Sequence, residues 1–176
     1  MRPWPSRSTA VPQRRRPAGR RVTDAPFRIR PARAADLPAL VAIERIAFTD
    51  PWSRGDFEDC LASGVQILVA EADNAVLGYI VGRAVEDQSE ILNLGVTLHA
   101  RRRGIGTGLV RHMLAAFAAA GVREAFLEVR ESNLAAQELY RGFGFQDVGR
   151  RRRYYRRPVE DAVILRAAIS AVGSPA

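Results

Sequence analysis

The chain has 176 residues, 47% of them hydrophobic, which is enough for one domain with a single core. One cysteine and two histidines exclude an internal disulfide framework and argue against a zinc site, so we expect no metal. No apolar run is long enough to span a bilayer, and the sparse cysteine fits a reducing compartment. These properties predict a cytoplasmic protein without a membrane segment.

The net charge of +8 is unevenly distributed along the chain. Residues 1–26 carry seven arginines and one aspartate, which leaves a charge of only +2 for the rest. This segment is also rich in proline and lacks apolar periodicity, so it is predicted to be a disordered tail. Its arginines offer the one expected route to nucleic acid. We therefore expect one domain over residues 27–170 and a short tail at 171–176.

The first half of this domain predicts short strands and two helices. Asp36 is suited to be an N-cap ahead of an apolar helical stripe, and Ser53 with Asp56 three residues later is a capping pair. Asp73 and Asn74 separate two apolar runs as a hairpin turn. The expected elements are a strand at 27–30, helices at 37–48 and 53–61, and strands at 66–71 and 76–85.

The second half alternates strands and helices. An apolar run at 91–96 precedes a glycine-rich turn, after which residues 109–117 carry one apolar helix face that ends near Gly121. There follow a strand at 124–130, a helix capped by Ser132 or Asn133, and strands at 143–148 and 161–169 connected by the basic stretch 150–157. This order predicts an α/β fold in which helices cover one mixed sheet.

The turn from Arg101 to Gly108 has glycines at three alternate positions directly before the helix. Glycine leaves backbone N–H groups uncovered and a helix N-terminus adds unpaired donors, so a phosphate or pyrophosphate is the expected guest. A flexible surface turn with solvated arginines is the alternative. The chain lacks the lysine of a Walker loop, and its G-x-G-x-G spacing differs from the dinucleotide fingerprint.

Two residues of the second half are candidates for proton transfer. Glu128 interrupts an otherwise apolar strand, where a desolvated carboxylate is suited to be a general base. The alternatives are that its strand face opens to solvent or that it pairs with Arg130. Tyr140 is placed to protonate a leaving thiolate, unless it is a core aromatic with its hydroxyl at the surface. Cys60 lies on an apolar helix face and is interpreted as a packed thiol rather than a nucleophile.

Residues 101–106 fit the R/Q-x-x-G-x-G/A loop of the GNAT family of N-acetyltransferases, which this chain resembles over about residues 27–170. The resemblance is sharpest to the bacterial ribosomal-protein-alanine N-acetyltransferase branch. It implies a single-domain fold with a mixed, largely antiparallel, splayed central sheet flanked by helices. One departure is Gly95, where many relatives carry alanine, so that only a methyl group is missing. The matching stretches are Asp50 to Ser53, Asn93 to Val96 with the glycine turn, Leu127 to Asn133, Leu139 to Phe145, and Arg153 to Tyr155 with Glu160 to Ala162.

The resemblance also implies roles by position. The glycine turn would hold the pyrophosphate of acetyl-CoA, Glu128 would be the general base and Tyr140 the general acid. Trp52, Ser53 and Tyr154 fall where the family receives its peptide. The residues implied to bind acetyl-CoA are Leu94, Gly95, Val96, Arg102, Arg103, Gly104, Ile105, Gly106, Thr107 and Asn133.

The implied activity is direct acetyl transfer from acetyl-CoA to the N-terminal amine, alanine in this branch, of a small-subunit ribosomal protein. The nearest alternative is a lysine or small-molecule acetyltransferase on the same fold, because selectivity depends on loops near Trp52 and Tyr154. A non-catalytic acyl-CoA-binding protein or a basic RNA-binding module is the remaining alternative. The presence of Glu128 and Tyr140 favours an enzyme.

Overall fold

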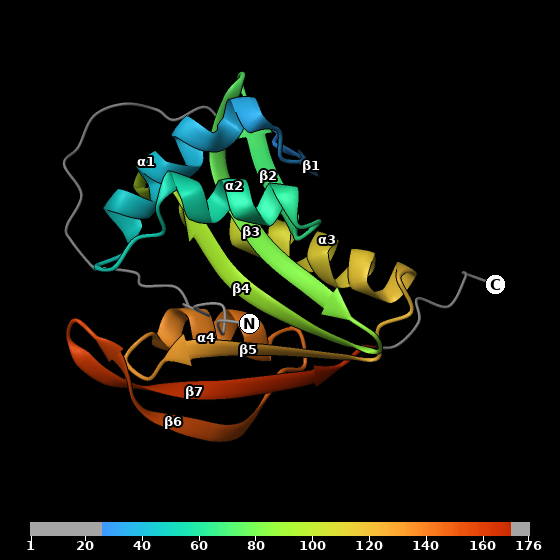
Figure 1. Ribbon diagram of the computed structural model, residues 1–176, viewed down its shortest axis with the longest axis vertical. Coiled ribbons are helices and arrows are strands. Elements are labelled where there is room, and N and C mark those ends of the chain that lie inside the picture. Colours follow the sequence, from blue (N-terminus) through green and yellow to red (C-terminus); the bar gives the residue numbers. More distant parts are fainter. Residues whose placement is uncertain (1–25, 170–176) are drawn as a thin grey trace.

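The computed structural model describes residues 26–169, which form one seven-stranded sheet with helices on both faces (Figure 1). The predicted tails at 1–26 and 171–176 lie outside the described residues, apart from Pro26. The strands are β1 (Arg28–Pro31), β2 (Gln66–Ala72), β3 (Ala75–Val85), β4 (Gln88–Val96), β5 (Glu124–Arg130), β6 (Gln146–Arg156) and β7 (Val159–Ala168).

The sheet has the strand order β1-β2-β3-β4-β5-β7-β6, and every neighbouring pair is antiparallel except β4 and β5. Short turns connect β2 to β3, β3 to β4, and β6 to β7. The parallel pair needs a longer crossover, which α3 (Ile105–Ala119) supplies. The predicted class, an α/β fold with one mixed and largely antiparallel sheet, is therefore confirmed.

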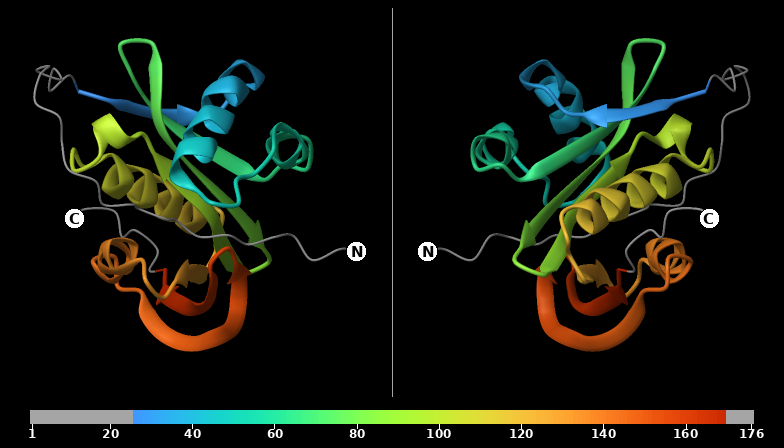
Figure 2. Two further views of the ribbon diagram at one scale, coloured as in Figure 1. Left: turned by 90° about the vertical axis from the view of Figure 1, so that its left-hand side faces the viewer. Right: turned by 90° about the vertical axis from the view of Figure 1, so that its right-hand side faces the viewer.

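The helices cover the two faces of the sheet in pairs (Figure 2). α1 (Leu37–Ala47) and α2 (Arg54–Ala62) lie on one face, and α3 and α4 (Leu134–Arg141) lie on the other. Each face has its own apolar core, one around Phe57 and Tyr79 and the other around Leu109 and Phe117. Such helices are stabilised mainly by burying an apolar stripe. None of the helices within residues 26–169 is long and apolar enough to cross a membrane.

β4 and β5 share only a short ladder, which joins residues 88–91 to residues 124–127. Beyond it the two strands continue and diverge (Figure 1). A register shift in the β3–β4 pair between Val81 and Gly82 lies close to the start of the divergence and marks a bulge. The implied splay of the central sheet is therefore confirmed.

Two helix N-termini are capped by the predicted side chains. The Ser53 hydroxyl accepts a hydrogen bond from Asp56 N at 3.3 Å, and the Asp56 carboxylate accepts one from Ser53 N at 2.6 Å. Of the two candidate caps of α4, Asn133 is the one used, because its Oδ1 accepts a hydrogen bond from Ala136 N at 3.2 Å. Local hydrogen bonding therefore determines where α2 and α4 begin.

The prediction that Asp36 caps the first helix is wrong. Asp36 occupies the N-cap position of α1 but makes no side-chain capping bond. Its carboxylate instead lies 2.7 Å from the Arg30 guanidinium and accepts a hydrogen bond from Arg33 N at 2.7 Å. The hydrogen bond from Arg30 is the main cause that holds the pKa of Asp36 below its usual range. A neighbouring strand thus competes successfully for this side chain.

Two predicted boundaries also differ from the structure. α3 begins at Ile105 rather than after Gly108, because Gly104 adopts a left-handed conformation, with φ of 77°, and ends the preceding turn. β6 continues to Arg156 through the basic stretch predicted as a connection. It is the edge strand of the sheet, so its arginines are exposed without disturbing the core.

Candidate functional site

The diverging ends of β4 and β5 form the centre of the site. Leu94, Gly95 and Val96 lie on β4 beyond the last residue paired with β5, while their other edge is paired with β3. On the β5 side they have no partner strand within residues 26–169. This backbone edge is available to hydrogen-bond an extended ligand.

The glycine turn follows the end of β4 and leads into α3. Arg102 and Gly104 both have positive φ, 63° and 77°, which curls the turn ahead of the helix. A Cβ at Gly106 would meet only Leu139, at 3.5 Å, so packing against the protein does not require glycine there. The bare backbone leaves the N–H groups of the first helical turn open to an anion.

The remaining positions of the turn differ in what they contact. The Ile105 side chain is buried, which leaves only its backbone N–H for a ligand. A Cβ at Gly108 would lie 3.0 Å from the Phe27 ring, so this glycine serves the packing of α3 on the sheet. Arg103 and Thr107 are half-buried at the helix start. The turn therefore combines a fixed helix N-terminus with polar side chains suited to a phosphate.

Asn133 has one satisfied and one unsatisfied end. The residue is 7% exposed, and its Oδ1 caps α4. Its Nδ2 is buried and makes no hydrogen bond to any described residue. Leaving a buried donor unpaired costs about 1–3 kcal/mol, so this amide is suited to donate to a ligand. The Thr97 hydroxyl, just past the end of β4, is likewise buried without a partner in the described part of the chain.

Glu128 occupies the first position of β5 beyond the β4–β5 ladder. Its side chain is 5% exposed, and Oε1 lies 2.6 Å from Nε of Arg151, whose side chain is 57% exposed. The alternative of a pair with Arg130 is wrong, because Arg130 pairs with Glu160 at 3.3 Å. A groove of about 300 Å³, lined in part by Glu128, Arg151 and the exposed Gln88, opens beside the carboxylate. Glu128 is thus buried, paired and close to solvent.

Tyr140 is buried on α4, with 2% of its surface exposed. Its ring packs against Phe145 at a centroid distance of 5.7 Å, so the core-aromatic alternative is correct for the ring but not for a surface hydroxyl. Burial, the charge of Glu44 and then Tyr140 raise the pKa of Tyr79 well above its usual value. Tyr140 is thus a phenol enclosed on the α4 side of the sheet.

The three residues implied to receive the peptide are placed differently from one another. Trp52 is 3% exposed and packs in the core against Phe57, with the ring centroids 5.4 Å apart. Ser53 is exposed but uses its hydroxyl to cap α2. Tyr154 is half-buried beside Arg151, whose guanidinium lies 5.6 Å from the ring centroid. Tyr154 is thus brought close to the Arg151–Glu128 pair.

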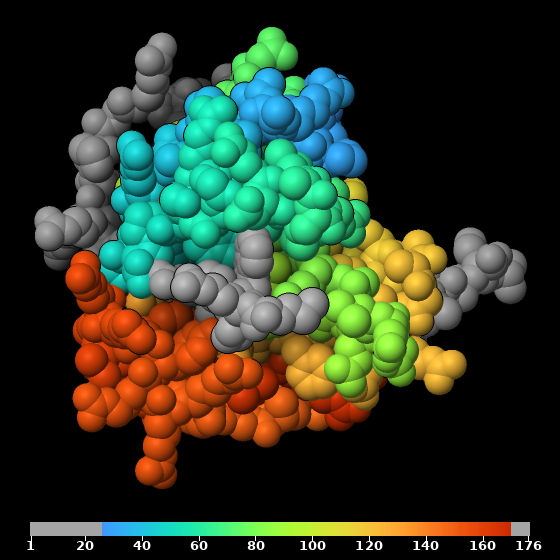
Figure 3. Space-filling view, viewed as in Figure 1, coloured from blue at the N-terminus to red at the C-terminus, as the bar shows by residue number. Residues whose placement is uncertain are grey.

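The α1–α2 loop, residues 48–53, touches the turn between β6 and β7. The Thr49 hydroxyl donates to Arg157 O at 2.7 Å, and the Arg130 guanidinium contacts both groups at 3.3 Å. Arg130 also stacks on Tyr155 at 4.0 Å from the ring centroid. On this face the surfaces of the cyan helical layer and the orange hairpin meet (Figure 3). The loop and the hairpin form a bridge at the rim of the site.

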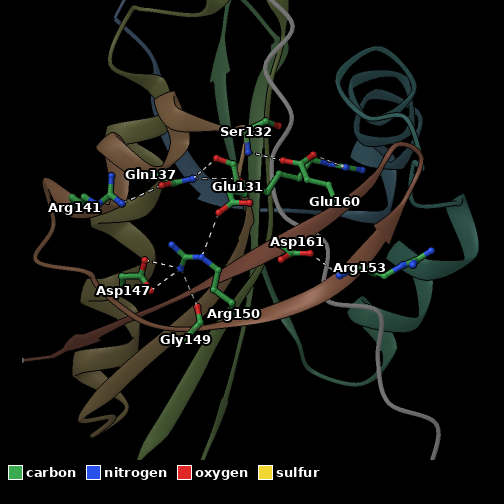
Figure 4. Close-up of polar contacts among 11 residues, drawn as sticks. Glu131, Ser132, Gln137, Arg141, Asp147, Gly149, Arg150, Arg153, Glu160 and Asp161 are labelled. Atoms are coloured by element: carbon green, nitrogen blue, oxygen red, sulfur yellow. Dashed lines mark hydrogen bonds and ion pairs between the residues drawn. The ribbon is translucent and has the colours of Figure 1, made fainter.

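The β6–β7 hairpin is itself fixed to the end of β5. The carboxylate of Glu160 points toward the backbone of Ser132, whose N–H donates to it at 2.5 Å (Figure 4). Arg150 joins Asp147, at 2.8 Å, to Glu131, at 3.4 Å, in the same view. These contacts hold the hairpin against the start of α4.

Comparison with known proteins agrees with this geometry. The model of the Acetyltransferase (GNAT) family matches residues 37–145. The chain belongs to this family. It is 35% identical over 137 residues to the ribosomal protein bS18-alanine N-acetyltransferase of Salmonella typhimurium, covering 77% of this chain and 93% of that protein. It is 42% identical over 122 residues to the N-alpha-acetyltransferase RimI of Mycobacterium tuberculosis, covering 66% and 75%.

A solved structure extends the match to three dimensions. The crystal structure of the ribosomal-protein-S18-alanine N-acetyltransferase from Escherichia coli superimposes with a TM-score of 0.77 at 30% identity. The alignment covers 85% of this chain and 98% of that one. The resemblance to the GNAT family and to its ribosomal-protein-alanine branch is thereby confirmed.

One residue of this GNAT chain was missed by sequence reasoning. Glu44 on α1 is only 1% exposed and lies among the donors of Tyr79, Asn93 and Trp52. A glutamate in a helix is ordinarily a solvated residue, and no motif marks this one. The available signal is its spacing, since Glu44 falls on the buried face of α1 between Leu40 and Ala47.

Proposed function

We propose that this GNAT enzyme transfers the acetyl group of acetyl-CoA directly to the N-terminal amine of a protein, a small-subunit ribosomal protein that begins with alanine. The observation that carries the proposal is the position of Glu128. It is a buried carboxylate at the first position of β5 that is not paired with β4, where the two strands diverge. The names of the relatives in the ribosomal-protein-alanine branch support the choice of acceptor.

The residues around the splay fit acetyl-CoA. This molecule would supply the acetyl group activated as a thioester. The N–H groups at the start of α3, together with Arg102 and Arg103, would bind its phosphates. The unpaired Nδ2 of Asn133 would donate to it. The Val96 N–H would polarise the thioester carbonyl and stabilise the oxyanion that forms on amine attack.

Two side chains would move protons in opposite directions. Glu128 would remove the proton of the acceptor's ammonium group, directly or through a water, so that the free amine attacks the carbonyl carbon. The adjacent groove gives this proton a route to solvent. Tyr140 would give its phenolic proton to the departing sulfur as the bond between carbon and sulfur breaks. Each group would contribute about a hundred- to ten-thousand-fold in rate.

The bridge between Thr49 and Arg157 favours a chain end over a lysine as the acceptor. The α1–α2 loop and the β6–β7 turn meet through this 2.7 Å hydrogen bond at the rim of the site. A continuous polypeptide would have to pass across the bridge to present a lysine, whereas a chain terminus can enter beneath it. A protein N-terminus is therefore the better substrate class.

The same proposal places the enzyme in the cytoplasm, where small-subunit ribosomal proteins are made. It requires no metal, and no group of three or more potential ligand side chains within residues 26–169 is arranged to hold one. Contact with nucleic acid would be limited to the arginines of residues 1–26.

The test is mass spectrometry of a peptide that begins with alanine and contains one internal lysine, after incubation with the enzyme and acetyl-CoA. Acetylation of the α-amine supports the proposal. Acetylation of lysine alone, or of neither group despite acetyl-CoA binding, contradicts it. A second peptide with a blocked N-terminus is the matched control and should remain unmodified.

A further inference from the structure

Glu44 is a buried carboxylate at the meeting point of four segments. Its Oε2 accepts a hydrogen bond from the backbone N–H of Trp52 at 2.7 Å. Its Oε1 accepts one from Asn93 Nδ2, also at 2.7 Å, and one from the Tyr79 hydroxyl. The four segments are α1, the α1–α2 loop, β3 and β4. One side chain therefore links the helical layer to two strands of the sheet.

The three donors are neutral and enclosed. Tyr79 is completely buried, and burial first and the charge of Glu44 second raise its pKa well above the usual value. The phenol therefore stays protonated and remains a donor. Packing alone would not select a carboxylate here, since the other buried residues of α1 are apolar and an ion is expensive to bury. The three hydrogen-bond donors compensate the cost of burying this carboxylate.

Each donor fixes a part of the proposed site. Trp52 N belongs to the α1–α2 loop at the acceptor side, and Asn93 directly precedes the 94–96 edge of β4 at the donor side. Tyr79 adds a second contact with that edge, because a Cβ at Gly95 would lie only 2.7 Å from Cε1 of its ring. The β4 edge is also held by its pairing with β3, so loss of the Glu44 carboxylate should displace mainly the acceptor loop.

The α1–α2 loop is held at its other end through the exposed Thr49 hydroxyl, one of whose partners, Arg130, is buried. Thr49 is exposed and bonds to Arg157 O and Arg130. At the Trp52 end the anchor is Glu44, which is buried and accepts its hydrogen bonds from three fixed donors. Glu44 joins the loop to β3 and β4, whereas Thr49 joins it to the β6–β7 turn, so Glu44 is the anchor that sets the loop's position relative to the β4 edge.

We infer that Glu44 is a positioning residue, which sets the acceptor loop relative to the β4 edge where the thioester would lie. The inference rests on the proposed function and adds a residue to it. Glu44 touches neither substrate. It acts through Trp52 N, Asn93 and Tyr79, and its loss should impair acceptor use more than acetyl-CoA binding.

The experiment uses the full chain with Glu44→Ala, Glu44→Gln and, as a matched control, Glu58→Gln on the exposed side of α2. Three quantities are measured: the hydrogen-exchange rate of the Trp52 amide, the Kd of acetyl-CoA, and kcat and KM for the alanine peptide. In Glu44→Ala the Trp52 amide should exchange at least about tenfold faster, because its acceptor is gone. Its kcat/KM for the peptide should fall about ten- to a hundredfold, as expected for a displacement on the order of 1 Å.

Glu44→Gln is the rescue variant. Its amide oxygen can still accept from Trp52 N, and once the Asn93 amide rotates by 180° its amide nitrogen can donate to Asn93 Oδ1, which has no partner among the described residues. We expect kcat/KM within about fivefold of the parent, which corresponds to about 1 kcal/mol. The Kd of acetyl-CoA should change by less than about threefold in both variants, since neither touches it.

Should Glu44→Ala not fold, Glu44→Asp replaces it, because the shorter side chain keeps the charge but cannot reach all three donors. An unchanged Trp52 exchange rate, or an unchanged kcat/KM in a folded variant, overturns the inference. A purely structural role would lower the melting temperature and leave the kinetics of the folded enzyme intact. Failure of the parent enzyme to acetylate any N-terminus would instead refute the proposed function, so the two failures are distinguishable.

Discussion

Glu44 and Glu128 are both nearly inaccessible to solvent, at 1% and 5% exposure, but they are held in different ways. Glu44 is enclosed by neutral donors that are themselves buried. Glu128 pairs with Arg151, whose side chain is more than half exposed. Fixed neutral donors keep a carboxylate in one place, whereas an exposed guanidinium can be exchanged for an incoming ammonium. Burial alone therefore does not distinguish the proposed base from a positioning carboxylate. The kind of hydrogen-bonding or charged partner does.

The comparison predicts that Glu128→Gln has the largest effect on activity. The amide cannot accept the ammonium proton, so kcat/KM should fall by about a hundred- to ten-thousand-fold. Steady-state kinetics with the alanine peptide across pH 6 to 9 measures this. Near-normal turnover across that range would show that Glu128 is not the base, and Glu44 would then be the buried carboxylate to test next.

Tyr140→Phe should have the next largest effect. The ring and its contact with Phe145 are preserved, so the fold should be unaffected, while the proton donor to the leaving sulfur is lost. We expect kcat to fall about a hundredfold. The matched control is Tyr155→Phe, which keeps the ring beneath Arg130 and should leave kcat almost unchanged. Equal activity of the two variants would remove Tyr140 from the mechanism.

For the two glutamates, the effects on stability should rank in the opposite order from the effects on activity. Glu44→Ala leaves three buried donors without their acceptor, so the free energy of unfolding should fall by at least about 2 kcal/mol. Glu128→Gln weakens a pair with an exposed arginine and should cost less than about 1 kcal/mol. Urea denaturation of both variants measures the difference. Similar losses would erase the distinction between the two carboxylates.

Arg151→Gln tests the other member of the Glu128 ion pair. If Arg151 competes with the acceptor's ammonium for Glu128, its removal should lower the KM for the peptide by up to about fivefold, since exposed pairs are worth less than about 1 kcal/mol. The fall in KM should be larger for basic peptides than for acidic ones, because removal of Arg151 also removes a positive charge that repels them. A raised KM would mean instead that Arg151 helps to bind the acceptor.

Cys60→Ala should have the smallest effect. Burial, followed by the nearby charges of Asp56 and Asp59, raises the pKa of the Cys60 thiol to about 12, so it is neutral at the pH of any assay. Raising a thiol pKa favours the uncharged form, so the native protein should resist alkylation from pH 7 to 9. We expect unchanged kcat. Loss of turnover would indicate transfer through an acetyl-cysteine rather than direct transfer.

Local sequence signals predicted the helices and most strands of this fold well. The pairing of distant strands was predicted only through the resemblance to a known family. Ser53 and Asn133 begin helices because their capping bonds are made within three residues, which a sequence displays. The Asp36 prediction failed because Arg30, on a separate strand, competes for the carboxylate. The strand order, with β7 between β5 and β6, depends on pairings that no local pattern reveals.

Prediction of the site has the same limit, because a local sequence pattern does not reveal contacts between distant residues. The glycine turn and Glu128 stand out as a motif and as a break in an apolar run. The role of Arg151 was not foreseen, because an arginine-rich stretch is typical of a loop and here forms an exposed edge strand. Glu44 was missed because its donors come from positions 52, 79 and 93, which are distant in sequence from one another.

Gly95 restricts the order in which this sequence can change during evolution. A Cβ at this position would lie 2.7 Å from the Tyr79 ring and 3.0 Å from Ile43. An alanine introduced first would force the ring away from Glu44. A smaller residue at position 79 would have to be acquired beforehand, after which the alanine would be tolerated. The two substitutions are therefore epistatic, and a descendant of this chain can acquire alanine at position 95 through one order of mutation but not the other.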